Sequence, residues 1–214
     1  MADTPAPARA YHHGDLRRAL LTAALDEIAA GGPDAVSLRA LARRAGVSHA
    51  APAHHFGDRP GLLTAIATEG FDLLAQELSE ADGLREAGAR YVRFAVRHRA
   101  YFQVMFRPEL LHTGDPALVT ARSHASAALG AGITGLPPQN RGADARTAGI
   151  AAWSLAHGFA TLLLARNLTE PVGGQDPEEY FRLLADLLFQ GGGNSNGNSD
   201  GDGDSDSDSD SDSD

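Results

Sequence analysis

The residues most suited to chemistry lie in one short stretch, residues 47–59, with the sequence VSHAAPAHHFGDR. Serine beside histidine could act in hydrolysis, neighbouring histidines could bind a metal ion, and a short polar helix could enter a DNA groove. Hydrolysis is disfavoured because the chain has neither a nucleophile elbow nor a Gly-rich phosphate loop. Metal binding is disfavoured because adjacent helical residues, such as the histidine pairs at 12–13 and 54–55, point about 100° apart. We therefore predict no enzyme, no cofactor and no metal site.

Composition limits the class of protein. The chain has 214 residues, 43% of them hydrophobic, which is enough for a substantial core. Cysteine is absent, so disulfides and thiolate sites are excluded. No run of about 18 uninterrupted apolar residues occurs, and the N-terminal residues do not resemble a signal peptide. We expect a soluble, cytoplasmic protein with no membrane partner.

The charge distribution is uneven. The net charge is −10, but residues 200–214 contain eight Asp, and without them it becomes −2. Residues 9–59 carry seven Arg and five acidic residues, a local charge of +2. The stretch around the histidines is therefore compatible with a nucleic-acid partner.

The apolar spacing is helical throughout, and no alternating strand pattern is present, so we predict an all-α fold. A first helix is expected to be capped by Asp15 and to end at residues 31–33. Its apolar face consists of Leu16, Leu20, Ala23, Ala24 and Ile28. Ser37, Ser48 and Asp58 then stand where helix caps are expected, which divides residues 37–80 into a short, a second short and a long helix.

The remaining sequence predicts further helices. They are expected at about residues 84–98, 100–106, 116–132, 144–167 and 176–189, with a loop at 135–142. The 144–167 segment is apolar on nearly all sides, which indicates burial against a partner subunit. From residue 191 onward the chain contains only Gly, Asn, Ser and Asp, a composition typical of disorder.

The two short helices have the features of a helix-turn-helix. Ala42 allows close approach, Gly46 suits a left-handed turn, and Val47 can fill the inner corner. An ordinary helical hairpin has the same spacing, but the flanking arginines and the polar outer side of residues 48–55 favour DNA. If Ser48 is the cap, Pro52 is the fourth helical residue, where it costs less than the roughly 3 kcal/mol of an interior proline.

Residues 40–67, ALARRAGVSHAAPAHHFGDRPGLLTAIA, resemble the DNA-binding signature of the TetR family of bacterial transcriptional regulators. In that signature the recognition helix closes with Tyr-x-His-Phe, followed by a basic residue and a Leu-Leu pair. Residues 11–25 resemble the family's first helix. YFQVMF and AWSLAHGFATLLL resemble a subgroup with a Trp-His-Gly feature, here Trp153, His157 and Gly158.

The resemblance implies a domain division. Residues 1–10 would be a flexible arm and 11–57 the helix-turn-helix domain. Residues 58–190 would form the helical ligand-binding and dimerisation domain, with 58–80 as connecting helix, and 191–214 a disordered acidic tail.

The resemblance also assigns roles on DNA. His49, Ala50 and His54 would face the major groove, His55 would lie at its phosphate edge, and Phe56 would anchor the helix in the core. The residues expected at the phosphate backbone are Ser37, Ser48, Arg59, Arg39, Arg9, Arg17 and His12. Ala53 stands where the family usually has Tyr, whose hydroxyl reaches a phosphate. We expect weaker DNA binding, or compensation by His54.

In the second domain, aromatic residues could line a small-molecule cavity or form plain core. They are Tyr91, Phe94, Phe102, Met105, Phe106, Trp153, His157 and Phe159. The polar ring of His157 needs a partner in the core or on a ligand.

Together these features predict a homodimeric repressor that binds a palindromic double-stranded DNA operator and an unknown small-molecule effector. The alternative is a dimeric small-molecule-binding module with weakened or lost DNA binding. The acidic tail could compete with DNA as a tethered polyanion, or have no role.

Overall fold

The computed structural model describes residues 13–133 and 145–189, and every regular element within them is helical. The prediction of an all-α fold is confirmed. In chain order the elements are α1 (His13–Gly31), η1 (Pro33–Ala35), α2 (Leu38–Arg44), α3 (Ala51–Phe56), α4 (Arg59–Ser79), α5 (Leu84–Arg97), α6 (Arg99–Met105), η2 (Pro108–Leu110), α7 (Pro116–Ile133), α8 (Ala145–Leu164), α9 (Thr169–Val172) and α10 (Pro177–Phe189).

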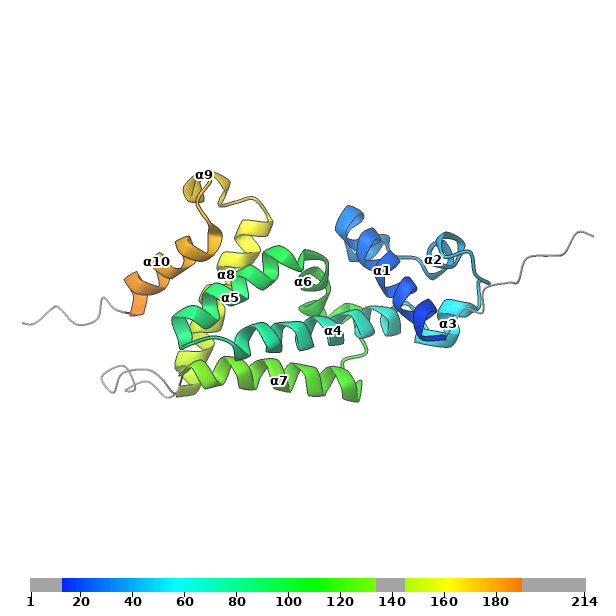
Figure 1. Cartoon of the computed structure of the whole chain (residues 1–214), viewed down its shortest axis with the longest axis horizontal. Coiled ribbons are helices and arrows are strands. Elements are labelled where there is room, and N and C mark those ends of the chain that lie inside the picture. The colour runs from blue at the N-terminus through cyan, green and yellow to red at the C-terminus, as the bar shows by residue number, and fades with distance from the viewer. Residues whose placement is uncertain (1–12, 134–144, 190–214) are drawn as a thin grey trace, which may run out of the picture.

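The helices form a small head and a larger body. Figure 1 shows α1, α2 and α3 gathered at one end of the molecule, with α5 to α10 toward the other end. The long α4 runs from α3 into the body, where it packs along α7 and also contacts α5 and α6. The head therefore joins the body through α4 and through contacts between α1 and α6.

The core of the head follows the predicted spacing on α1. Leu20, Ala24 and Ile28 are completely buried, and Leu41 of α2 and Leu62 of α4 complete the core with them. The helix begins at His13, two residues before Asp15, so the prediction that Asp15 caps it is wrong.

The turn between α2 and α3 has the predicted helix-turn-helix form. Gly46 has a φ of +66°, a conformation that strains residues with a side chain. The N–H of Val47 donates to the carbonyl of Ala42 at 3.0 Å, which closes the turn on the small residue.

The recognition helix starts later than the sequence suggested. Residues 49 and 50 form a turn, α3 begins at Ala51, and the carbonyl of Ser48 accepts the N–H of Ala51 instead of starting the helix. The prediction that Ser48 is the cap is therefore wrong. Pro52 lies in the first turn of α3, where helical N–H groups have no partner within the helix, so its missing N–H costs nothing.

The other two caps differ from each other. Ser37 occupies the cap position of α2, but its side chain makes no capping hydrogen bond. Asp58 caps α4 as predicted, because its Oδ1 accepts the N–H of Gly61 at 2.7 Å. The N–H of Asp58 donates to the carbonyl of Phe56 at 3.0 Å. The cap of α4 is therefore bonded both to its own helix and to the last residue of α3.

The start of α4 also lies very close to the end of α3. A Cβ atom on Gly61 would be 2.0 Å from the carbonyl oxygen of Phe56, so only glycine fits there. The glycine lets α4 begin directly beside the recognition helix, which fixes the position of α3 relative to α4.

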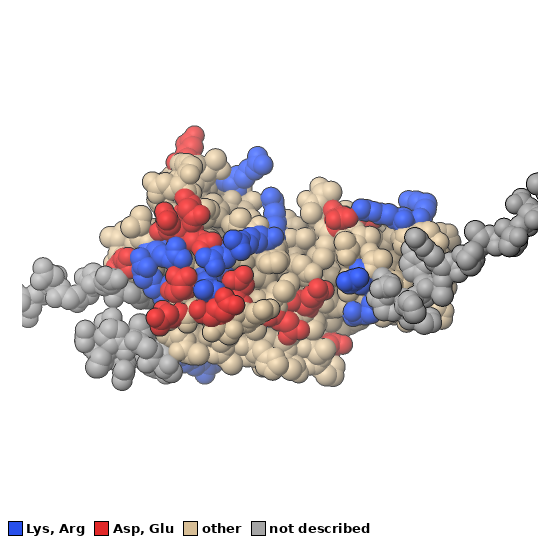
Figure 2. Space-filling model, in the orientation of Figure 1, with Lys and Arg blue, Asp and Glu red and all other residues tan. Residues whose placement is uncertain are grey.

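The body is held together by an apolar core and by ion pairs between α5 and α10. The predicted helices at 84–98, 100–106, 116–132 and 176–189 are confirmed with small shifts in their ends. The guanidinium groups of Arg85, Arg93 and Arg182 form two-pronged ion pairs with Asp186, Glu178 and Glu86, respectively. Figure 2 shows basic and acidic side chains side by side over the region of α5 and α10.

The structure differs from the predicted helices after α7, and some of the predicted segments lie outside the described residues. The helix expected at 144–167 ends at Leu164, and the short α9 that follows was not predicted. Residues 1–12, 134–144 and 190–214 lie outside the described residues, and with them the predicted arm, loop and acidic tail.

We predict that Gly61→Ala destabilises the protein by about 1–3 kcal/mol, the usual cost of forcing extra atoms into a packed site. The reason is the clash with the carbonyl of Phe56. Thermal unfolding measures the loss. Gly114→Ala is the control, since a Cβ there meets no atom within 4 Å. Equal melting temperatures for the two variants would contradict the close approach.

Candidate functional site

The outer surface of the helix-turn-helix is formed by small and polar side chains. Those that the sequence assigned to DNA and that are exposed are Ser37, Arg39, Ser48, His49, Ala50, Ala53 and His54. They come from the start of α2, the turn and the exposed side of α3, and α2 and α3 pack against each other. Hydroxyl, imidazole and guanidinium groups are thus available on one small element for hydrogen bonds to phosphates or base edges.

Other arginines of the head are engaged in contacts within the protein. Arg59 donates to the carbonyls of Val36 at 3.1 Å and Pro33 at 2.8 Å, so it ties α4 to η1. The guanidinium carbon of Arg17 lies 5.3 Å from the ring centroid of Phe56. These contacts give Arg59 a structural role in the head. Its phosphate contact, like that of the exposed Arg17, stays a prediction.

The end of the recognition helix also faces inward in part. Phe56 is half-buried and packs against the core, in line with its predicted role as an anchor. His55 is half-buried too, with its ring centroid 6.2 Å from that of Phe56. His54 is therefore the more accessible of the two neighbouring histidines.

The junction of head and body is built around the first turns of α4. Thr64 is buried, and its hydroxyl donates to the carbonyl of Pro60 at 2.8 Å and accepts the N–H of His112 at 2.9 Å. The ring Nε2 of His112 lies 2.9 Å from Oδ1 of Asp58. The N–H of Gly61 and the ring of His112 both hold the pKa of Asp58 below its usual value. The segment before α7 is thus fastened to the cap of α4.

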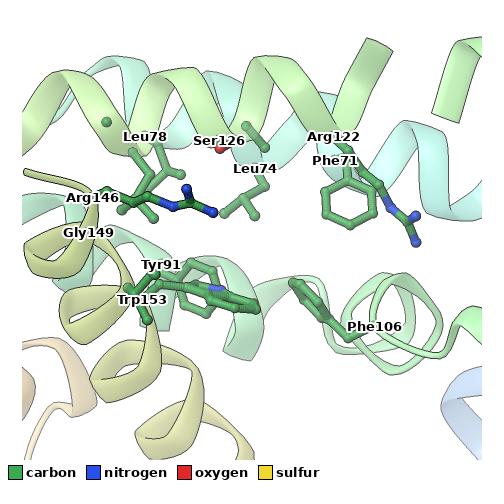
Figure 3. A pocket seen from close by; sticks show the side chains of 14 residues that line it. Phe71, Leu74, Leu78, Tyr91, Phe106, Arg122, Ser126, Arg146, Gly149 and Trp153 are labelled. Atoms are coloured by element: carbon green, nitrogen blue, oxygen red, sulfur yellow. The ribbon is translucent and has the colours of Figure 1, made fainter. Parts of the chain in front are cut away.

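A cavity of about 470 Å³ lies within the body, between α4, α5, α7 and α8 (Figure 3). The described residues that line it are Phe71, Leu74, Leu78, Tyr91, Phe106, Arg122, Ala125, Ser126, Leu129, Gly130, Arg146, Gly149, Ile150 and Trp153. Most of its wall is apolar, and its volume falls within the range of about 300–1,000 Å³ that small-molecule sites occupy.

His157 lies behind the cavity wall. Its Nδ1 is 2.8 Å from the hydroxyl oxygen of Tyr91, and its ring is packed among those of Phe102, Phe106 and Trp153. Burial lowers the pKa of His157 and raises that of Tyr91. A neutral imidazole therefore holds the Tyr91 ring in place, and the polar partner that the sequence required for His157 is in the core.

Comparison with protein families identifies both halves of the chain. Residues 20–66 match the family described as bacterial regulatory proteins, tetR family, and residues 84–188 match the Tetracyclin repressor-like C-terminal domain. The chain belongs to the TetR family of bacterial transcriptional regulators. It is a transcriptional regulator with a helix-turn-helix head, and the resemblance seen in the sequence is confirmed. The narrower Trp-His-Gly subgroup stays a prediction.

Solved structures of other proteins have a similar fold. A protein of unknown function from Rhodococcus sp. RHA1 is 32% identical, with a TM-score of 0.70 over 86% of this chain and 98% of its own. A TetR family transcriptional regulator, PfmR, from Thermus thermophilus is 24% identical, with a TM-score of 0.58 over 80% of this chain and 97% of its own. The second likeness is one of fold alone. No match was found among curated proteins.

The cavity of this TetR-family regulator uses only part of the predicted ligand set. Tyr91, Phe106 and Trp153 line it, whereas Phe94, Phe102, Met105 and His157 are not among its lining residues. Phe94, Phe102 and Met105 are buried core. Phe159 belongs to a separate cluster, with its ring stacked 6.1 Å from that of Tyr180.

Sequence reasoning missed the walls contributed by α4 and the polar groups from α7 and α8. Phe71, Leu74 and Leu78 face the cavity from α4, and Arg122 and Arg146 reach it from α7 and α8. The available signal was Arg122, a charge next to the apolar stripe of α7 that includes Leu118, Ala121 and Ala125. The described residues contain no cluster of three His, Asp or Glu able to hold a metal ion.

We predict that His157 makes the stability of the protein depend on pH. Its pKa is lower in the folded than in the unfolded state, so the unfolded chain takes up a proton first as the pH falls below about 6.5. The free energy of unfolding should therefore decrease from about pH 7 to about pH 5 more in the wild type than in His157→Gln. Melting temperatures across this range measure the difference. The exposed His124, changed to Gln, is the control and should keep the wild-type slope; equal pH slopes for all three proteins would contradict the prediction.

Proposed function

We propose that this TetR-family regulator is a repressor that binds a palindromic DNA operator through α3 and releases it when a small molecule enters the body. The observation that carries the proposal is the polar, exposed surface of the helix-turn-helix. His49 and His54 offer hydrogen bonds to base edges, and the methyl group of Ala50 can contact a thymine methyl. Ser37, Arg39, Ser48 and the half-buried His55 would hold phosphates on either side.

The body supports the proposal that two copies form a homodimer. Leu162 of α8 is 45% exposed, and Leu183 and Leu187 of α10 are 57% and 73% exposed. Large apolar side chains on neighbouring solvent-facing helices favour burial against a second subunit. Two heads in one dimer could then meet two half-sites about one turn of DNA apart, roughly 34–36 Å.

The apolar character of α8 needs the same explanation. Residues Arg146–Leu164 form a helix that is, by length and composition alone, long and apolar enough to span a membrane. Only 22% of this apolar stretch is buried within one chain. We assign this surface to the second subunit and to the cavity, because Ile150 and Trp153 already line that cavity. The regulator is proposed to act in the cytoplasm, where its operator lies, without a membrane partner or enzymatic activity.

The cavity supports a route from ligand to DNA. Phe71 and Leu74 place α4 in its wall, while the start of the same helix is fastened to α3 by Gly61 and to the segment before α7 by Thr64. A ligand that displaces α4 would move the recognition helix with it, and the two heads would no longer fit successive major grooves.

A dimeric ligand-binding module with weakened DNA binding is the alternative. Ala53 is the observation that favours it, because the exposed methyl group cannot supply the hydrogen bond to phosphate expected of the usual Tyr. Measuring the affinity of the protein for the DNA upstream of its own gene separates the two. If the protein shows no binding to this DNA that is both selective for sequence and sensitive to salt, the repressor proposal is contradicted.

We predict that Ala53→Tyr tightens binding to that DNA by about fivefold per half-site, equivalent to about 1 kcal/mol for one hydrogen bond. The exposed position leaves room for the larger ring. Ala53→Phe is the matched control, since it adds the ring without the hydroxyl. If the two variants bind DNA equally well, the hydroxyl makes no contact and the proposed orientation of α3 is wrong.

We predict that the combined substitution Leu183→Glu and Leu187→Glu converts the dimer to a monomer of about 22.3 kDa. Two added charges would be buried in the interface without partners. Sedimentation analysis gives the mass. The control is Val119→Glu, on the exposed surface of α7, which should remain dimeric. A double variant that keeps twice the monomer mass would exclude this face as the interface.

A further inference from the structure

We propose that the effector is an organic anion with an apolar body, bound by Arg122 and Arg146 in the cavity of about 470 Å³. The inference rests on the proposed function, in which this cavity is the effector site, and it adds the chemical class of the ligand. The two arginines come from different helices, α7 and α8, and reach the same apolar space.

The geometry of Arg122 combines apolar and charged contacts. Its guanidinium carbon lies 5.4 Å from the ring centroid of Phe71, a cation–π distance, and both residues line the cavity. Figure 3 shows Arg122 beside Phe71 at one end of the cavity and Arg146 near Leu74 and Leu78 at the other. Stacking on Phe71 limits the rotation of the guanidinium group, so its N–H donors are partly oriented before a ligand arrives.

The charge balance of the wall selects for a negative ligand. The described lining residues include two arginines and no Asp or Glu. Two positive guanidinium groups in one pocket repel a cation and attract an anion. Guanidinium binds carboxylate and similar oxyanions through paired hydrogen bonds. Ser126, one turn after Arg122, adds a hydroxyl to the same wall.

The rest of the wall defines the remainder of the ligand. Phe71, Leu78, Tyr91, Phe106 and Trp153 present aromatic or aliphatic surface. A small inorganic ion would leave this surface in contact with water, whereas an aromatic or long aliphatic body would cover it. A carboxylate or sulfonate joined to an aromatic or long aliphatic group would pair with the arginines and also cover the apolar wall.

The test compares two fluorescent probes that differ in one charged group. 8-Anilinonaphthalene-1-sulfonate is an apolar anion, and N-phenyl-1-naphthylamine has the same rings without the sulfonate. Titration of the full chain gives both dissociation constants. The single tryptophan, Trp153, lies in the cavity wall, so quenching of its emission is a second readout. Ser126→Phe, at an exposed position on the wall, fills the cavity.

We expect Arg122→Gln and Arg146→Gln each to weaken binding of the sulfonate about tenfold, while the dissociation constant of the neutral probe changes less than about twofold. The corresponding Lys variants should retain most of the affinity, because they keep the charge. Arg99→Gln, an exposed arginine outside the cavity, is the control and should bind both probes like the wild type.

Two results would overturn the inference in different ways. If Ser126→Phe blocks both probes but the Gln variants weaken both equally or neither, the cavity remains the ligand site and its preference for anions is wrong. If Ser126→Phe changes neither binding nor Trp153 quenching, the probes do not enter the cavity. The effector site of the proposed function would then fail, and the anion class with it.

Discussion

The helix α4 is the element on which the rest of the structure depends. Its first turns hold the recognition helix through Gly61 and the segment before α7 through Asp58 and Thr64. About ten residues later, or roughly 15 Å along the helix axis, Phe71 and Leu74 form part of the cavity wall. Because a single helix with continuous hydrogen bonds joins these regions, a shift at one end is carried to the other.

The contacts between α4 and its neighbours differ in strength, and this matters for the proposed response of α3 to a ligand. Asp58 and the ring of His112 are both more than half exposed, so the contact between them contributes little. The bond from the N–H of His112 to the buried Thr64 is harder to break, since water cannot easily replace it. The strongest constraint is steric, at Gly61, where no side chain fits. The close approach at Gly61 leaves no room for α3 to shift against the start of α4, so α4 and α3 are expected to move together.

The sequence predicted those features that depend on neighbouring residues. The apolar face of α1, the left-handed Gly46 and the cap at Asp58 all follow from local spacing and were confirmed. The start of α3 was predicted wrongly because Ser48 has a typical capping side chain, whereas residues 49–50 form a turn and the helix begins at Ala51. The cavity was only partly predicted, because α4 and α7 meet across distant parts of the chain, and aromatic content alone does not distinguish wall from core.

In the proposed function, the position of α8 would connect ligand binding with the geometry of the dimer. The first half of α8 lines the cavity with Arg146, Ile150 and Trp153. The second half carries the exposed Leu162, which belongs to the proposed dimer surface. A ligand drawn to Arg146 therefore acts on a helix that also contacts the second subunit in the proposed dimer, as well as on α4. The distance between the two heads depends both on the tilt of α4 within each subunit and on the packing of α8 between subunits. An anion bound as proposed would act on both, so the proposed response would not require a large movement of either helix alone.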